Sequence, residues 1–336
     1  MRVAVVGATG MIGHHTALAV LEAGHELTVI HRATSNLKSL DGLRFESRVG
    51  DLDDRLSLTA AFGGADAVIN CASYYPTEPR PWRAEVERAA AQARNFYAAC
   101  AEHDLRKVVY VGAAIALARD PEGRPGTEES AMKERPGDLT PYVQVKWELD
   151  RLAVEHARRG LPVVVGIPSM CFGEYDAGPS TGQLIVEIAN GTLPGYIRGR
   201  RNVVYAGDAG RGLVMACERG RPGERYLFTG ENVTMDDLVK TIAEVAGVEP
   251  PGRVIPLGLA RLLSKLQGAR YRLFGGSPPR LSSTAIAVMA SGQFLDGAKA
   301  RSELGYEPRV SVREAVARAL AWFRANGYVR AGQGRE

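Results

Sequence analysis

The sequence has few cysteines and no cysteine cluster. Its 336 residues contain four cysteines, which lie far apart and form no C-x-x-C pair. A zinc cage and a disulfide framework both need closely spaced or numerous cysteines, so we expect neither. The six histidines show no H-x-x-x-H spacing, and we predict no metal site. These absences favour a reducing, cytoplasmic setting.

Long apolar runs and a strong net charge are also missing. No stretch approaches the roughly 20 apolar residues needed to cross a bilayer, so we expect no membrane span. The first residues form an apolar run that is not preceded by a charged leader, so we expect no secretory signal. A net charge of +4 is small for this length and does not indicate a nucleic-acid partner.

Short apolar runs alternate with helical patterns through the first half of the chain. The runs cover residues 3–6, 27–30, 67–70, 107–111 and 162–166, and the helical patterns cover 12–24, 56–62, 85–103 and 142–159. Runs that are apolar on both faces are typical of strands buried in a parallel sheet. The alternation predicts an α/β fold with a Rossmann-type doubly wound parallel sheet, followed by a smaller mixed α/β cap. Ligands of such sheets bind beyond the carboxyl ends of the strands.

A glycine-rich turn follows the first strand and precedes the first helix. Gly7 permits a tight turn, Gly10 lets the backbone approach a pyrophosphate, and Gly13 lets the helix pack closely on the strand. The free N–H groups and the dipole of the helix start would then hold the phosphates. The alternative is a turn that needs glycine for packing only. The expected dinucleotide contacts in this turn are Gly7, Thr9, Gly10, Met11, Ile12 and Gly13.

The end of the second strand indicates which dinucleotide binds. An acidic residue usually holds the free ribose 2′-OH of NAD at this position, but here the strand ends in His31 and Arg32. A guanidinium pairs well with the 2′-phosphate of NADP, so we favour NADP, with NAD as the alternative if Arg32 is merely solvated. Further cofactor contacts are expected after the third and fourth strands, at Asp51, Leu52, Cys71, Ala72 and Ser73.

Tyr142 and Lys146 lie four residues apart at the start of a predicted helix, so both side chains share one face. The ammonium of Lys146 would favour the phenolate of Tyr142, and it could also donate to cofactor ribose hydroxyls. Such a tyrosine can pass a proton to or from a substrate oxygen during hydride transfer. The Y-x-x-x-K pattern is common by chance, and its position about 130 residues after the phosphate loop is what makes it informative.

Together these motifs resemble the extended short-chain dehydrogenase/reductases. The likeness rests on the glycine turn, the Gly50-Asp51 pair, Tyr142 with Lys146, and Ile167-Pro168-Ser169, and it covers nearly the whole chain. It is greatest to the nucleoside-diphosphate-sugar epimerase/dehydratase and dihydroflavonol-4-reductase branch. The resemblance implies an NAD(P)-dependent oxidoreductase or epimerase acting at a carbonyl or secondary alcohol, with a nucleotide sugar as a candidate substrate. It also implies cofactor contacts at Ile167, Pro168 and Ser169, and a homodimer built through residues 85–103 and 142–159.

One position departs from the family pattern. Members usually carry Ser or Thr after the fifth strand, hydrogen-bonding the substrate carbonyl, whereas this chain has Ala113 at the matching position. Losing one such donor can cost about 10²–10³ in rate. Ser73, Ser169 or Thr140 could replace it. The alternative is a non-catalytic NADP-binding protein with a redox-sensing or regulatory role.

Substrate contacts and domain limits complete the expectations. Substrate residues would be Tyr74, Tyr75, Ala113, Phe172, Arg200 and Arg201. The two arginines suit a pyrophosphate or plain solvent. We expect an NAD(P)-binding domain at 1–167, joined by 203–222 and about 294–305, a cap at 168–202 and 223–293, and a C-terminal helix and tail at 306–336.

The stretch from residue 250 to 295 has a charge of one sign. It contains six basic residues and no acidic one, so it accounts for the whole positive excess of the chain. A solvated helix face is the plainest interpretation, and an anionic ligand or a membrane surface are the alternatives.

Overall fold

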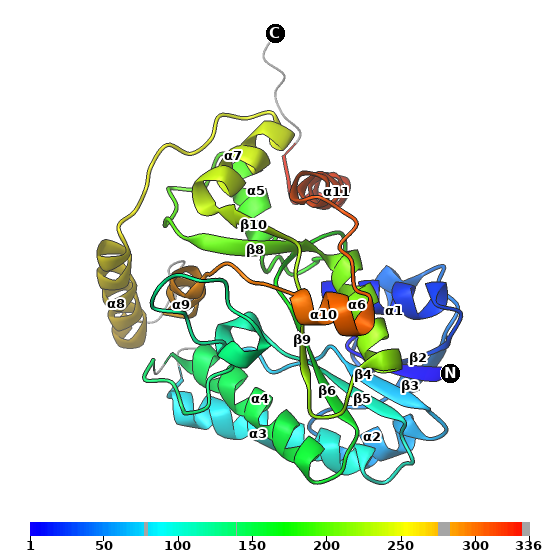
Figure 1. Cartoon of the computed structure of the whole chain (residues 1–336). Coiled ribbons are helices and arrows are strands. Elements are labelled where there is room, and N and C mark those ends of the chain that lie inside the picture. Colours follow the sequence, from blue (N-terminus) through cyan, green and yellow to red (C-terminus); the bar gives the residue numbers. More distant parts are fainter. Residues whose placement is uncertain (77–79, 139, 275–282, 331–336) are drawn as a thin grey trace.

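A seven-stranded parallel sheet forms the larger part of the computed structural model, which describes residues 1–76, 80–138, 140–274 and 283–330 (Figure 1). Its strand order is β3-β2-β1-β4-β5-β6-β9. The strands are β1 (Arg2–Val6), β2 (Glu26–His31), β3 (Glu46–Val49), β4 (Ala67–Asn70), β5 (Lys107–Val111), β6 (Val163–Pro168) and β9 (Arg225–Phe228). The order reverses between β1 and β4, which is the switch point where such sheets bind ligands.

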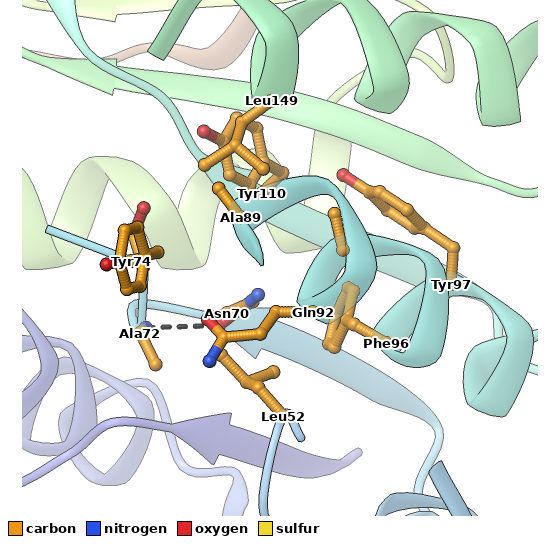
Figure 2. Close-up of a pocket in the computed structure, with 12 residues that line it drawn as sticks. Leu52, Asn70, Ala72, Tyr74, Ala89, Gln92, Phe96, Tyr97, Tyr110 and Leu149 are labelled. Carbon is orange, nitrogen blue, oxygen red and sulfur yellow. Dashed lines mark hydrogen bonds between the residues drawn. The ribbon is translucent and has the colours of Figure 1, made fainter. Parts of the chain in front are cut away.

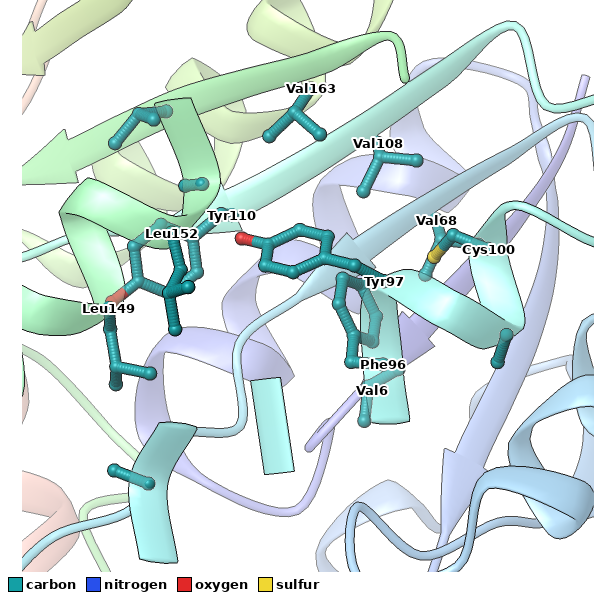
Figure 3. Packing of buried hydrophobic residues seen from close by; sticks show 14 of the residues in the cluster. Val6, Val68, Phe96, Tyr97, Cys100, Val108, Tyr110, Leu149, Leu152 and Val163 are labelled. Atoms are coloured by element: carbon teal, nitrogen blue, oxygen red, sulfur yellow. The ribbon is translucent and has the colours of Figure 1, made fainter. Parts of the chain in front are cut away.

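Helices cover both faces of this sheet. Helices α2 (Arg55–Phe62), α3 (Trp82–Cys100) and α4 (Pro141–Arg158) bury one face, where Phe96, Tyr97 and Leu152 pack against the strands (Figure 3). Helices α1 (Met11–Glu22), α6 (Ala206–Arg219) and α10 (Ala298–Leu304) bury the other. The predicted doubly wound fold is therefore confirmed, with every predicted strand and helix of the first half present.

A second, smaller sheet has the order β10-β8-β7. Its strands are β7 (Met170–Phe172), β8 (Arg200–Tyr205) and β10 (Glu231–Thr234), and its helices are α5 (Gln183–Ala189), α7 (Met235–Ala246) and α11 (Val312–Ala325). The hydroxyls of Thr234 and Ser311 cap α7 and α11 by accepting from the third backbone N–H of each helix. Sheet and helices share one apolar core.

Helices α8 (Leu257–Phe274) and α9 (Ser283–Ser291) pack against each other beside the cap (Figure 1). The described residues also contain three single-turn helices: η1 (Lys38–Leu40), η2 (Ala114–Ala116) and η3 (Glu128–Ser130). Among the helices of the described chain, none has both the length and the apolar character to cross a membrane.

The domain limits differ from those predicted in two places. Strand β9 belongs to the large sheet, although residues 223–293 were assigned to the cap. Its Tyr226, Leu227 and Phe228 are fully buried, as in a central parallel strand, but so short a run was easily missed. Strand β8 extends to Tyr205 within the cap sheet, so the return to the large domain begins at α6 and not at residue 203. Residues 331–336 of the predicted tail lie outside the described residues.

Candidate active site

Two of the three loop glycines are required by packing. Gly7 has φ +83°, and a Cβ on it would lie 2.9 Å from the backbone nitrogen of Ala72 at the end of β4. A Cβ on Gly13 would lie 2.1 Å from the carbonyl oxygen of Gly7. Any side chain at these two positions would therefore push the first helix away from the sheet.

Gly10 is different, because the space above it is open. A Cβ there would meet only the Gly7 carbonyl oxygen, at 3.8 Å. Gly10 is the N-cap of α1 and has no side chain to bond the first-turn N–H groups, while Thr9 is half-buried beside it. The Met11 side chain is buried against Cys171 and Val204, so only its backbone faces the loop. Ile12 is partly buried. The cradle fits a pyrophosphate.

The end of β2 carries an exposed cation. His31 is fixed by the hydroxyl of Ser47, at 2.8 Å, and by the carbonyl of Arg32, at 2.9 Å. Arg32 itself is exposed and forms no ion pair with a described residue. The site therefore offers a guanidinium where an NAD-specific carboxylate would stand.

The turn after β3 holds Asp51. One oxygen of its carboxylate accepts from the backbone N–H of Asp53 at 3.0 Å, and its own N–H donates to Ser57. Leu52 lines a recess with Asn70, Ala72, Gln92 and the rings of α3, close to the switch point (Figure 2).

Three successive residues after β4 meet different partners. The Cys71 thiol donates to Thr16, and burial raises its pKa to about 12, so it is not a reactive thiolate. Ala72 lies under Gly7, and its N–H donates to the side chain of Asn70. The Ser73 hydroxyl accepts a 2.7 Å hydrogen bond from Lys146 Nζ.

Tyr142 and Lys146 lie on one face of α4, as predicted, and the Lys146 Nζ is 5.6 Å from the centre of the tyrosine ring. Burial lowers the pKa of Lys146 to about 8. Burial, and next the neighbouring Tyr75, raise the pKa of Tyr142 above its usual value. The expected stabilisation of a Tyr142 phenolate by Lys146 is thus outweighed, because the ammonium bonds to Ser73 and the surroundings are apolar.

Ala113, which replaces the serine or threonine usual in the family, lies in the apolar surroundings of Tyr142. Ala113 and Tyr142 pack against a small apolar cluster of Ile115, Val143 and Ala287, the last from α9. Thr140 is the N-cap of α4 and makes no side-chain capping bond.

The segment after β6 supplies a buried hydroxyl. Ser169 is 9% exposed, and its Oγ has no hydrogen-bond partner among the described residues. Pro168 is buried before it. The side chain of Ile167 is 1% exposed in the core, so it has no surface for a cofactor and its predicted contact can come only from its backbone.

Of the three predicted aromatic substrate residues, one lies beside Tyr142 and two do not. Tyr75 is 52% exposed and its ring lies 4.9 Å from that of Tyr142, facing the site. Tyr74 instead donates to Glu85 at 2.7 Å. The expectation for Phe172 is wrong, because its ring is fully buried in the cap core and cannot touch a substrate.

The two predicted arginines differ in burial. Arg200 is exposed and donates to the Gly123 carbonyl at 2.7 Å. Arg201 is 7% exposed and donates to the carbonyls of Arg200 and Met289. Burial, and next the charge of Arg119, lower the pKa of Arg201 to about 10. Sequence reasoning missed Arg119, which comes from the loop after β5.

The sequence also gave no role to the histidine pair on α1. His14 stacks on Tyr175, with ring centres 3.5 Å apart, and Tyr175 has φ 67°. Burial lowers the pKa of both His14 and His15 to about 4, so both are neutral near pH 7. They join α1 to the cap. No group of His, Cys, Asp and Glu in the described part of the chain is arranged to hold a metal ion.

Comparison with known proteins identifies a family and similar structures. The model of the NAD dependent epimerase/dehydratase family matches residues 3–228. A solved structure of a nucleoside-diphosphate-sugar epimerase from Pseudomonas aeruginosa is 44% identical, with a TM-score of 0.86 over 98% of this chain and 99% of that one.

Two curated relatives are more distant. The sterol demethylase protein B of Methylococcus capsulatus is 29% identical over 98% of this chain and 100% of its own length. A putative dihydroflavonol 4-reductase from Synechocystis is 26% identical over 97% of this chain and 95% of its own.

Proposed function

Because this chain belongs to the NAD dependent epimerase/dehydratase family, whose named relatives are enzymes, we propose that it catalyses hydride transfer at a carbonyl or secondary alcohol carbon. Tyr142 is the acid/base, and Lys146 holds the cofactor and sets the charge beside the tyrosine.

One chain of contacts carries this proposal. Ala72 touches the phosphate-loop glycine Gly7, and the next residue, Ser73, bonds Lys146 of the Tyr142–Lys146 pair. The loop that would hold a pyrophosphate and the phenol that would move a proton are therefore linked through two consecutive residues of one strand end. A chance Y-x-x-x-K pattern on a surface helix would have no such link.

The residues fit a nicotinamide dinucleotide. The open cradle at Gly10 suits the pyrophosphate, and the partnerless hydroxyl of buried Ser169 suits a carboxamide. When bound, the nicotinamide accepts or donates a hydride. Tyr142 then takes the proton from a substrate hydroxyl, or returns it to a carbonyl oxygen, and Tyr75 shields the reacting face from water.

Lys146 supplies the positive charge for that proton transfer. Its ammonium already bonds Ser73, and it can donate its other protons to ribose hydroxyls. A cofactor that brings its own positive ring would add to this charge and lower the pKa of Tyr142 from its raised value.

A nucleotide sugar is the substrate class that we favour. The Pseudomonas relative is named a nucleoside-diphosphate-sugar epimerase, and Arg201 with Arg119 places two guanidinium groups near one another beside α9. A bound diphosphate would relieve their repulsion. Replacing Arg200 and Arg201 by Gln should raise the KM for such a substrate with little change in cofactor affinity.

NADP is the cofactor that we favour, because the exposed Arg32 follows β2 and no carboxylate stands there. NAD remains the alternative, as the family model is defined by NAD dependence.

A non-catalytic, redox-sensing role is the second candidate function. Ala113 lies in an apolar cluster with Tyr142 and offers no hydroxyl to a substrate carbonyl. A sensor would bind NADPH and turn over no carbonyl, sugar or alcohol.

The experiment combines binding and turnover. Thermal-shift titrations with NAD(H) and NADP(H), then with nucleotide sugars, rank the ligands without assuming a reaction. Tyr142→Phe should then lower kcat by about 10²–10⁴ and leave cofactor stabilisation unchanged. Turnover that survives in Tyr142→Phe contradicts the assigned acid/base, and cofactor binding without any turnover in the native protein favours the sensor.

The assembly that we propose is a homodimer through α3 and α4, which lie side by side on one face of the sheet (Figure 1). Two helices from each subunit would form a four-helix seam. The cytoplasm suits the four cysteines, which are all free thiols.

A further inference from the structure

Helix α8 presents a row of leucines to the outside of the molecule. Leu259, Leu262 and Leu266 are 45%, 55% and 59% exposed, and their spacing of three and four residues places them on one side of the helix. The opposite side holds Ala260 and Ser264, which are buried against the body of the protein. In Figure 1, α8 stands at the edge of the molecule, next to α9.

This row is unusual for the chain. Seven large apolar side chains are strongly exposed among the described residues, and three of them belong to α8. Isolated exposed leucines need no explanation, but a continuous apolar row on a surface helix marks a contact surface.

Basic side chains flank the leucines on both sides. At 100° per residue, Arg261 and Lys265 lie on one side of the row and Arg270 on the other. All three are exposed, and none forms an ion pair with a described residue. By contrast, the exposed Arg313 of α11 pairs with Glu244 at 2.7 Å.

The sign of this charge is uniform. No acidic residue occurs anywhere from 250 to 295, so this surface lacks the mixed charges of an ordinary protein interface. An apolar row bordered by cations is complementary to a surface whose outer layer is negatively charged and whose interior is apolar. That description fits an anionic lipid bilayer better than another protein.

We propose that α8 docks the protein on an anionic membrane surface. The three leucines enter the boundary between headgroups and acyl chains, and Arg261, Lys265 and Arg270 bond lipid phosphates. No described helix is long and apolar enough to cross the bilayer, so the docking is to its surface. The proposal is independent of the reaction, because it concerns a surface and not Tyr142.

Helix α8 is connected to the candidate active site through α9. Helix α8 packs on α9, and Ala287 of α9 packs in the apolar cluster that includes Tyr142. A docked α8 would therefore hold the apolar side of the site on the side of the molecule that faces the bilayer.

The test measures binding of the full chain to vesicles. The protein should co-sediment with phosphatidylcholine vesicles containing 30 mol% phosphatidylglycerol, and much less with pure phosphatidylcholine. Binding should weaken as salt rises from about 50 to 500 mM. Absence of saturable binding to the anionic vesicles at low salt would overturn the proposal.

Matched variants locate the surface. The double change Leu262→Ser and Leu266→Ser should weaken binding at least about tenfold, because less apolar area enters the lipid. Arg261→Gln with Lys265→Gln should weaken binding to anionic vesicles only. The controls are Leu56→Ser on α2 and Lys240→Gln on α7, both exposed residues away from α8, which should bind as the native protein does.

A spectroscopic readout separates docking from loss of fold. Leu262→Trp should fold normally, because the side chain is exposed. The chain already has three tryptophans, so the emission of the native protein is subtracted, and the remaining emission should shift to shorter wavelength when anionic vesicles are added. An unshifted emission contradicts the proposal. So does concentration-dependent dimerisation that the Leu262→Ser and Leu266→Ser changes abolish, since a second copy of the chain would then be the occupant.

Discussion

The candidate site has two ends, the phosphate loop at residues 7–13 and the region around Tyr142, and different parts of the chain build them. At the phosphate loop the backbone makes the site, since Gly7 and Gly13 fit because they have no side chain and Gly10 leaves open space. At Tyr142 the side chains make the site, and they come from the end of β4, from α4 and from α9. The first end depends on one short segment, and the second on long-range packing.

The two ends of the site should therefore respond differently to pH. Backbone N–H groups at a helix start bind phosphate whatever the pH, because they do not titrate. The Tyr142 end contains groups whose pKa values depend on burial, with that of Lys146 lowered to about 8. We therefore expect mutations to act sharply on geometry at the loop, and through charge and hydrogen bonding at Tyr142.

The largest effect should come from Gly13→Ala. Its Cβ would lie 2.1 Å from the Gly7 carbonyl oxygen, so the loop and α1 must move apart. We expect the largest fall in dinucleotide affinity of the variants considered, together with a lower melting temperature and about 1–3 kcal/mol of lost stability, because the added methyl group overpacks this contact. Calorimetric titration and thermal denaturation measure the two effects.

Gly10→Ala is the matched control. Its Cβ would have only one neighbour, at 3.8 Å, so the melting temperature should hardly change. Affinity should still fall, because the methyl group occupies the space where a pyrophosphate would lie. Equal losses of stability in both variants would show that Gly10 is required by packing as Gly13 is, and that it does not leave open space for a pyrophosphate.

The same contrast explains what the sequence could predict. The strands, the glycine turn and the shared face of Tyr142 and Lys146 follow from local periodicity and spacing. The bond from Lys146 to Ser73, the closeness of Ala287 to Tyr142 and the stacking of His14 on Tyr175 join residues far apart in sequence. No local pattern encodes such contacts. Phe172 was misplaced for this reason, since it faces the cap core and not the crevice.

An intermediate effect is expected at the reacting end from Ala113→Ser. Ala113 packs beside Tyr142 with an ordinary extended backbone, so a serine there needs little rearrangement. If the site lacks a carbonyl donor, the new hydroxyl should raise kcat by up to about a hundredfold, by restoring one hydrogen bond in the transition state. Ala114→Ser, at the adjacent position, should have no such effect. Unchanged or lower turnover in Ala113→Ser would mean that another group already donates to the substrate.

The smallest effect is a pH dependence that only the reacting end should show. Burial holds the pKa of Lys146 at about 8, so its ammonium is charged below that pH and loses its proton as the pH rises. If the charged form binds the ribose, kcat/KM for the cofactor should fall about fivefold between pH 8 and 9, since this ratio reports groups of the free enzyme. Adenosine diphosphate, which reaches the loop but not Lys146, should bind equally well across that range. Lys146→Arg keeps its charge and should flatten the profile. A parallel fall for both ligands would place the titrating group at the loop, and the division between a pH-independent backbone end and a titrating side-chain end would be wrong.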